Sequence, residues 1–152
     1  MTLRVVLMVG PAASGKSTYI RERFPGHLIL NADRIRLELT GDAANQSRNG
    51  EVFRLLRKRL AEGLRKGRSV VVDNTNLLES SRGELYRVAE MFQARVEARV
   101  MATSLDECLR RNADRDRTVP EDVIRRQFGE YLTALSRLPR ESALSEVEIV
   151  SD

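Results

Sequence analysis

The apolar run LRVVLMV (residues 3–9) leads directly into the segment GPAASGKS (10–17). A nearly continuous apolar run is typical of a strand buried on both faces of a parallel sheet. The segment after it fits G-x-x-x-x-G-K-[ST], the loop that joins such a strand to a helix and wraps the phosphates of a nucleotide. The two segments predict a strand–loop–helix unit and a phosphate site. The recipient of a phosphoryl group stays open: water, a protein, a small metabolite or a nucleic-acid end.

Strand and helix patterns continue to alternate along the chain. We expect strands at 3–9, 27–31, 69–73, 95–102 and 146–150. We expect helices at about 16–24, from 32, and at about 51–66, 79–93, 104–112 and 120–136, with a polar loop over 40–50. Apolar positions 52, 53, 56, 60 and 64, for example, recur at helical spacing. The alternation predicts an α/β fold, a doubly wound parallel sheet of about five strands with helices on both faces.

Length and composition agree with a single domain over residues 1–152. Hydrophobic residues make up 41% and charged residues 32%, which is typical of a globular chain. The net charge of +4 favours a polyanionic partner. Cys108 is the single cysteine, so we expect no internal disulfide and a reducing compartment. No apolar run approaches the roughly 18 residues of a membrane span, and the start does not resemble a signal peptide. We therefore expect a cytoplasmic protein without a membrane partner.

Three polar clusters follow the first three predicted strands: GPAASGKS, NADRIR (31–36) and DNTN (73–76). In an open parallel sheet, ligands bind beyond the carboxyl ends of the strands. The fold would therefore gather these clusters at one edge, although they lie far apart in the sequence.

The first cluster and the third indicate a donor site for ATP with Mg²⁺. Lys16 is expected to bridge the outer phosphates, Ser17 to ligate Mg²⁺, and Asp73 to hold Mg²⁺ or its waters. No guanine-binding N-K-x-D pattern follows, which favours ATP over GTP. Asp73 could also be a polar end to its strand. The predicted nucleotide-binding residues are Gly10, Ala12, Ala13, Ser14, Gly15, Lys16, Ser17, Thr18, Arg115 and Arg117.

The second cluster indicates an acceptor site. Transfer to a hydroxyl needs a group that accepts its proton, and Asp33 is a candidate general base. Arg36 lies three residues on, on the same helical face, where it could clamp an anion. Asp33 could instead cap the helix, and the two side chains could form a plain salt bridge. Asn74, Thr75 and Asn76 offer donors and acceptors to a substrate, or simply form a turn.

An arginine-rich segment precedes Pro120 and predicts a lid over about 110–120. Lid arginines in small P-loop kinases stabilise charge on the transferred group. We expect this role for Arg115 or Arg117, and a solvated charged face for Arg110 and Arg111.

The segments GPAASGKST (10–18), NADRIR, DNTN and RNADRDRTVPEDVI (111–124) together resemble the bacteriophage 5′-polynucleotide kinase domain and related small P-loop kinases. The resemblance spans about residues 3–131. It implies ATP-dependent phosphorylation of a 5′-hydroxyl on DNA or RNA. By position it implies phosphate and Mg²⁺ roles for Lys16 and Ser17, a general base at Asp33, an acceptor-phosphate clamp at Arg36 and a lid arginine at Arg115.

The sequence departs from this family at three points. Asn74 stands where the family has an aspartate before Thr-Asn, and Asp73 lies one residue earlier. Asp116 replaces a usual glycine, and the loop before Pro120 is one residue shorter, so either Arg115 or Arg117 could face the donor. No D-x-D-x-T-type segment of the family's 3′-phosphatase domain is present, so we expect any such activity to come from elsewhere.

The sequence thus predicts transfer of the γ-phosphoryl group of ATP to the 5′-hydroxyl end of a polynucleotide. A small-molecule kinase for a sugar, nucleoside or antibiotic would keep Asp33 but need no clamp. A regulatory ATPase would not need Asp33 as a base. The preference between DNA and RNA, the acceptor length and the oligomeric state stay open.

Overall fold

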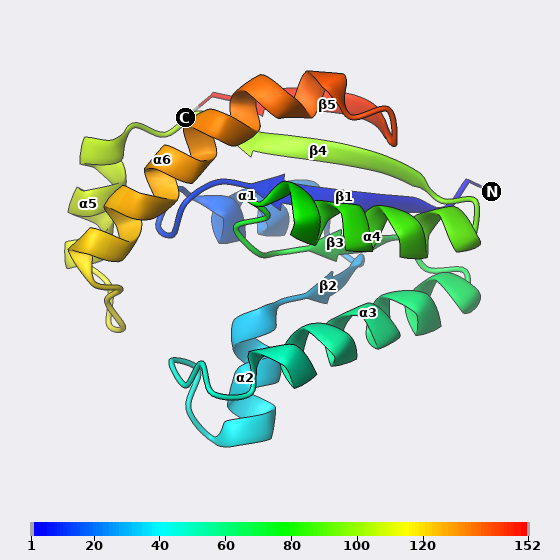
Figure 1. Cartoon of the computed structure of the whole chain (residues 1–152), viewed down its shortest axis with the longest axis horizontal. Helices are drawn as coiled ribbons and strands as arrows, with labels where there is room; N and C mark the ends of the chain where they lie inside the picture. Colours follow the sequence, from blue (N-terminus) through cyan, green and yellow to red (C-terminus); the bar gives the residue numbers. More distant parts are fainter. Residues whose placement is uncertain (1, 152) are drawn as a thin grey trace.

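Five parallel strands form the central sheet, in the order β2-β3-β1-β4-β5 (Figure 1). The structure is a computed structural model and describes residues 2–151. The strands are β1 Arg4–Val9, β2 Leu28–Leu30, β3 Val70–Val72, β4 Arg95–Met101 and β5 Leu144–Val150. The helices are α1 Lys16–Arg23, α2 Ala32–Thr40, α3 Asn49–Arg65, α4 Glu79–Met91, α5 Leu105–Ala113 and α6 Glu121–Arg137, followed by the 3₁₀ turn η1 Leu138–Arg140. The predicted doubly wound parallel sheet is confirmed.

Alternate residues of β1 face opposite layers of helices, which explains its nearly continuous apolar sequence. Val5 and Leu7 pack with α2, α3 and α4, whereas Val6 and Met8 pack with Ile20 and Phe24 on the α1 side. A further cluster joins Val9 to β4 and α6. Figure 1 shows α3, α4 and α6 in front of the sheet and α1 behind it. The core is therefore a three-layer arrangement around β1.

Two predicted element ends differ from the structure for local reasons. Helix α3 begins at Asn49 rather than 51, because the Val52 N–H already donates to the Arg48 carbonyl at 3.0 Å. Strand β5 begins at Leu144 rather than 146, because Leu144 pairs with Val96 before a register shift in the ladder. Neither difference changes the topology.

Part of the sheet face on the α1 side carries charge instead of apolar side chains. Glu97 and Arg99 lie opposite Val6 and Met8 in the β1–β4 ladder and are both buried. Arg99 pairs with Glu97 at 2.7 Å and with Glu148 of β5 at 3.0 Å. These pairs satisfy charges that burial would otherwise make costly.

No helix formed by residues 2–151 is long and apolar enough to cross a lipid bilayer.

Candidate active site

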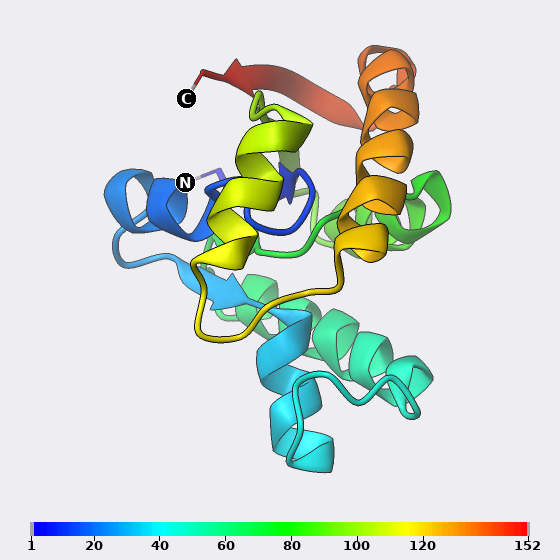
Figure 2. The ribbon, with the colours of Figure 1, turned by 90° about the vertical axis from the view of Figure 1, so that its left-hand side faces the viewer.

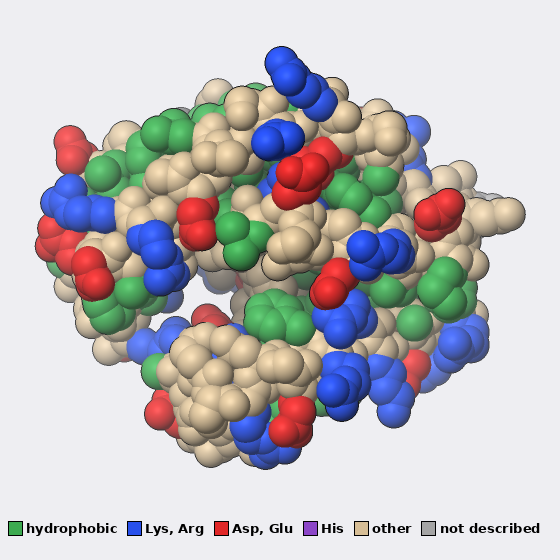
Figure 3. All heavy atoms as spheres, in the orientation of Figure 1, with side chains coloured by type: hydrophobic (Ala, Val, Ile, Leu, Met, Phe, Trp, Pro, Cys, Tyr) green, Lys and Arg blue, Asp and Glu red, His purple; other side chains and the backbone are tan. Residues whose placement is uncertain are grey.

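A cleft of about 930 Å³ lies at the carboxyl ends of β1, β2 and β3. Figure 3 shows it as a hollow between the α2–α3 part of the molecule and the part that holds α5 and α6. All predicted site residues line it except Gly10 and Asn76. The predicted residues in its wall are Ala12, Ala13, Ser14, Gly15, Lys16, Ser17, Thr18, Asp33, Arg36, Asp73, Asn74, Thr75, Arg115 and Arg117.

The loop between β1 and α1 depends on the two glycines of its G-x-x-x-x-G-K-S pattern. A Cβ on Gly10 would lie 2.7 Å from Ser14 Oγ and 3.2 Å from Met101 Cβ. Gly15 has a φ of 96°, which disfavours side chains, and begins α1 as its N-cap. Thr103 Oγ1, in the segment between β4 and α5, donates to the Ser14 carbonyl at 2.8 Å and supports the loop. Gly10 therefore shapes the loop from outside the cleft wall.

Lys16 folds back onto this loop. Its Nζ donates to the carbonyls of Gly10 at 2.7 Å and Pro11 at 2.8 Å. Burial lowers the pKa of Lys16 from 10.5 to about 8; the Asp73 carboxylate opposes that shift and Arg115 adds to it. A nucleotide phosphate at the loop would supply the negative charge that favours the ammonium form.

Two distant segments close the site around the loop, one through a side chain and one through its main chain. Gln127 of α6 accepts a hydrogen bond from the Ala12 N–H at 2.9 Å, and the Gly10 N–H donates to the Thr75 carbonyl at 3.1 Å. Neither Gln127 nor its neighbour Arg126 was among the predicted residues, although both line the cleft. A single glutamine in an amphipathic helix carries no motif that would reveal such a contact.

Two asparagines tie the end of β2 to the end of β3. Asn31 caps α2 by accepting from the Arg34 N–H at 3.0 Å, and its Nδ2 donates to Asp73 Oδ2 at 3.2 Å. In return, Asn74 Oδ1 accepts from the Ala32 N–H at 2.9 Å. Asn31, not Asp33, supplies the helix cap, so the capping interpretation of Asp33 fails. Asp73 and Asn74 both line the cleft.

Ser17 and Asp73 supply a hydroxyl and a carboxylate to the same cleft, an oxygen donor set that suits Mg²⁺. Mg²⁺ in nucleotide sites commonly takes one or two protein ligands together with substrate phosphates. The two residues therefore fit the metal.

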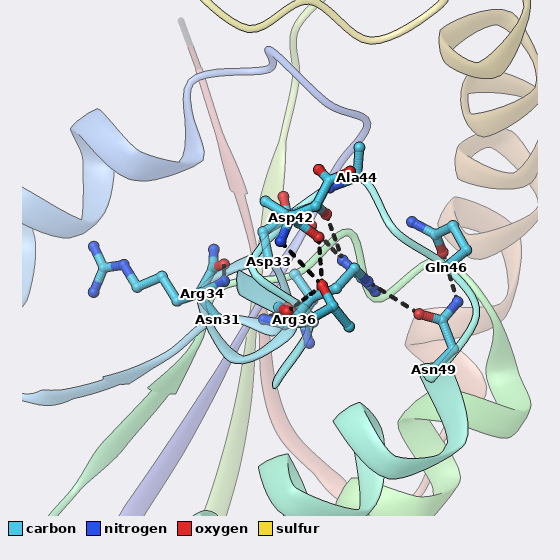
Figure 4. Close-up of polar contacts among 12 residues, drawn as sticks. Asn31, Asp33, Arg34, Arg36, Asp42, Ala44, Gln46 and Asn49 are labelled. Atoms are coloured by element: carbon cyan, nitrogen blue, oxygen red, sulfur yellow. Dashed lines mark hydrogen bonds and ion pairs between the residues drawn. The ribbon is translucent and has the colours of Figure 1, made fainter. Parts of the chain in front are cut away.

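The acceptor side is a cluster of polar contacts around Arg36 (Figure 4). Arg36 is buried, and its Nη1 donates to Asp33 Oδ1 at 2.6 Å. Its Nε donates to Asn49 Oδ1 at 3.0 Å, which anchors it to the start of α3. Its Nη1 also donates to the Ala43 carbonyl at 3.4 Å, so within residues 2–151 Nη2 is the guanidinium nitrogen without a hydrogen-bond partner. Arg34 points away from the cluster.

The lid segment lies beside the start of α2 (Figure 2). Arg117 reaches across to Asp33, with Nη1 3.6 Å from Oδ2. Arg115 also lines the cleft, and its positive charge adds to the lowering of the pKa of Lys16. At the base of the lid, the Asn112 side chain accepts from the Val119 N–H at 2.9 Å and donates to the Val119 carbonyl at 2.7 Å.

Two predictions for polar residues need revision. The expected solvated face holds for Arg110, whose side chain is 64% exposed, but fails for Arg111, which lines the cleft beside Gly15. Asn76 is buried, with a φ of 48°, and its Nδ2 donates to the carbonyls of Met8 at 2.7 Å and Val72 at 3.2 Å. Its amide group thus joins two strands and faces away from the main cleft.

The chain is similar in sequence or in structure to several known proteins. Over 145 residues the chain is 28% identical to the "Putative bifunctional polynucleotide kinase/RNA ligase" of Autographa californica nuclear polyhedrosis virus, covering 85% of this chain and 21% of the viral protein. A chain in the structure of the Pnkp1/Rnl/Hen1 RNA repair complex has a TM-score of 0.79 at 17% identity, covering 90% of this chain and 46% of that one. A gluconokinase from Sinorhizobium meliloti 1021 has a TM-score of 0.60 at 19% identity, covering 99% of this chain and 82% of that one. The chain thus spans about a fifth of the viral relative and less than half of the repair-complex chain.

A parallel sheet with a phosphate-binding loop after β1 and an arginine-bearing lid over the cleft defines a P-loop kinase domain. Residues 5–138 match the family AAA_33, described as an AAA domain. The chain belongs to that family.

Proposed function

We propose that this kinase domain transfers the γ-phosphoryl group of ATP to the 5′-hydroxyl end of a polynucleotide. The observation that carries the proposal is the Asp33–Arg36 pair, which lines the same cleft as the P-loop and lies just beyond the end of β2, two strands away from β1. The name of the viral relative and the net charge of +4 both agree with a nucleic-acid acceptor.

The residues divide the work between donor and acceptor. Residues 10–18 and Lys16 would hold the donor phosphates, and Ser17 and Asp73 would hold Mg²⁺, which neutralises phosphate charge when bound. Arg115 would stabilise charge on the transferred group. Asp33 would accept the proton of the attacking hydroxyl, because its side chain is half-exposed to the cleft and held by Arg36.

Arg36 would bind the phosphate 3′ of the terminal nucleoside. Asn49 and Asp33 fix the guanidinium at Nε and Nη1, so that Nη2 presents a preorganised donor. A small-molecule kinase has no need for such a donor beside its base. This difference separates the main proposal from the alternative of a sugar, nucleoside or antibiotic acceptor.

The test is transfer of label from γ-labelled ATP, with Mg²⁺, to a 5′-hydroxyl oligonucleotide. We expect Asp33→Asn to slow transfer by about 10²–10⁴. Glu38→Gln is the matched control, because Glu38 lies on the same helix and pairs outside the cleft with Arg59. No transfer by the unaltered protein, together with unchanged ATP turnover in Asp33→Asn, would refute the proposal and favour a regulatory ATPase.

A second arm tests the acceptor class. Arg36→Gln should weaken transfer to oligonucleotides far more than any transfer to a free nucleoside, while Arg34→Ala, which alters a side chain that points away, should change neither. Equal activity of the unaltered protein on a free nucleoside and an oligonucleotide would instead support the small-molecule alternative.

A further inference from the structure

A second hollow of about 330 Å³ opens beside the cleft, between the first halves of α3 and α4. Phe53 and Asn74 line both spaces, so the two are adjacent. Figure 3 shows hydrophobic side chains exposed in the hollowed surface between these two helices, with charged side chains beside them. None of the P-loop residues 10–18 lines the second hollow, so it lies on the acceptor side.

The lining suits a flat heteroaromatic group. Leu56 and Leu85 form a buried apolar floor, and Phe53, which lines both spaces, is 36% exposed as a residue. The amide of Asn49 is already bonded to Arg36 and Gln46, whereas Asn74, whose Oδ1 accepts from the Ala32 N–H, keeps its Nδ2 group as a donor for a polar ring edge. An aromatic ring beside amides is the combination with which proteins bind unstacked nucleobases. The volume lies within the range of small-ligand sites.

The hollow is connected to the proposed clamp through one residue. Asn49 lines the hollow, and its Oδ1 accepts the hydrogen bond from Arg36 Nε at 3.0 Å. A strand whose first phosphate lies on Arg36 Nη2 would therefore continue past Asn49 toward Phe53. The rim beyond is closed by the ion pair between Arg57 and Glu84, with Nη1 2.8 Å from Oε2.

We propose that this hollow binds the second nucleobase of the acceptor, the base attached 3′ of the phosphate on Arg36, and that Phe53 stacks on it. The inference rests on the proposed function. It identifies the minimal favoured acceptor as a dinucleotide, with Phe53 as a positioning residue for the strand. Because stacking accepts any base, it predicts little sequence preference at this position.

The test compares two acceptors, a nucleoside 3′-phosphate and the dinucleotide that extends it by one residue. Phe53→Ala should lower the ratio of kcat/KM for the dinucleotide to that for the nucleoside 3′-phosphate by about tenfold, the typical cost of losing one base stack. Phe53→Tyr should keep the ratio, whereas Phe53→Leu, which stays apolar but cannot stack, should behave like Phe53→Ala. Thermal unfolding of each variant shows whether it retains the fold.

A dinucleotide that lacks its second base provides the other half of a double-mutant cycle with Phe53→Ala. In the unaltered protein, removal of that base should cost about as much as Phe53→Ala, and in Phe53→Ala it should cost little more. The inference would be overturned if Phe53→Ala lowered kcat/KM equally on both acceptors. It would also be overturned if removal of the second base lowered kcat/KM as much in Phe53→Ala as in the unaltered protein. Transfer to the nucleoside 3′-phosphate with no gain from a second nucleotide would overturn this inference but leave the proposed function intact. No transfer to any nucleic acid acceptor would overturn the proposed function as well.

Discussion

The P-loop part of the donor wall is one continuous segment, residues 12–18, made of the loop after β1 and the first turn of α1. The acceptor wall is instead assembled from α2, the loop after it, the start of α3 and the segment after β3. In the donor wall, a glycine fixes the path of the main chain and Lys16 lies on its own loop. In the acceptor wall, Arg36 is held by Asp33 of its own helix and by Asn49 of α3. The comparison teaches that the phosphate site is encoded locally, while acceptor choice depends on long-range packing.

The largest expected effect separates two lid arginines that the sequence alone did not distinguish. Arg115→Ala should lower the transfer rate by about 10³-fold or more, because Arg115 lines the cleft and we expect it to stabilise charge on the transferred group. Arg117→Ala should cost less than about tenfold, since Arg117 pairs with Asp33 through a half-exposed contact. Single-turnover experiments measure the transfer rate of both variants. Equal losses of rate would show that the two arginines do not have separate roles at the donor and acceptor walls.

The second prediction tests the close packing of the main chain in the loop between β1 and α1. Gly10→Ala places a Cβ 2.7 Å from Ser14 Oγ, and overpacking of this kind costs about 1–3 kcal/mol in unfolding free energy. Gly83→Ala is the matched control, since its Cβ would meet no described atom within 4 Å and it lies inside α4, where alanine favours the helix by about 1 kcal/mol. Urea unfolding should move the two variants in opposite directions; a neutral Gly10→Ala would contradict the close packing of the loop.

The third prediction uses the titration of Lys16. Its pKa of about 8 means that the free protein loses this charge as the pH rises through 8, while bound phosphates favour the charged form. Nucleotide binding should therefore take up a proton and weaken by up to about tenfold per pH unit above pH 8. Calorimetry in two buffers of different ionisation enthalpy measures the uptake. Lys16→Arg should remove it, because arginine stays charged in this range; persistence of the uptake in that variant would assign it to another group.

The smallest expected effect sharpens the acceptor wall. Asn31→Ala removes the cap of α2 and should cost about 1 kcal/mol, as should Ser104→Ala, which removes the equivalent cap of α5. Only Asn31→Ala also loses the contact with Asp73, so it alone should slow phosphoryl transfer. Thermal unfolding and transfer rates measured together decide this, and parallel losses of activity in both variants would point to a general effect of stability.

Sequence patterns predicted the elements that depend on short-range spacing. The apolar β1, the P-loop and the periodic α3 each carry their signal within a few residues, and the structure differs only at their ends. The polar strand ends were also predicted to meet, because the rule for parallel sheets places them at one edge.

Contacts between distant side chains could not be predicted in this way. Gln127 reaches Ala12 across 115 positions, and the role of Asn76 in joining β1 to β3 depends on a left-handed backbone that its sequence does not announce. Arg111 turns into the cleft, while its neighbour Arg110 stays in solvent, because adjacent helical residues lie about 100° apart. These features follow from the packed fold and carry no local pattern.

The paired hydrogen bonds between Asn112 and Val119 tether both ends of the lid to one side chain. Only residues 113–118 lie between the tethered points, so the free contour is at most about 20 Å. A nucleotide entering the cleft would thus order a short closed loop and its arginine side chains, with little backbone entropy left to lose. We therefore expect the tether to restrict Arg115 and Arg117 to a small volume at the cleft, both before and after a nucleotide binds.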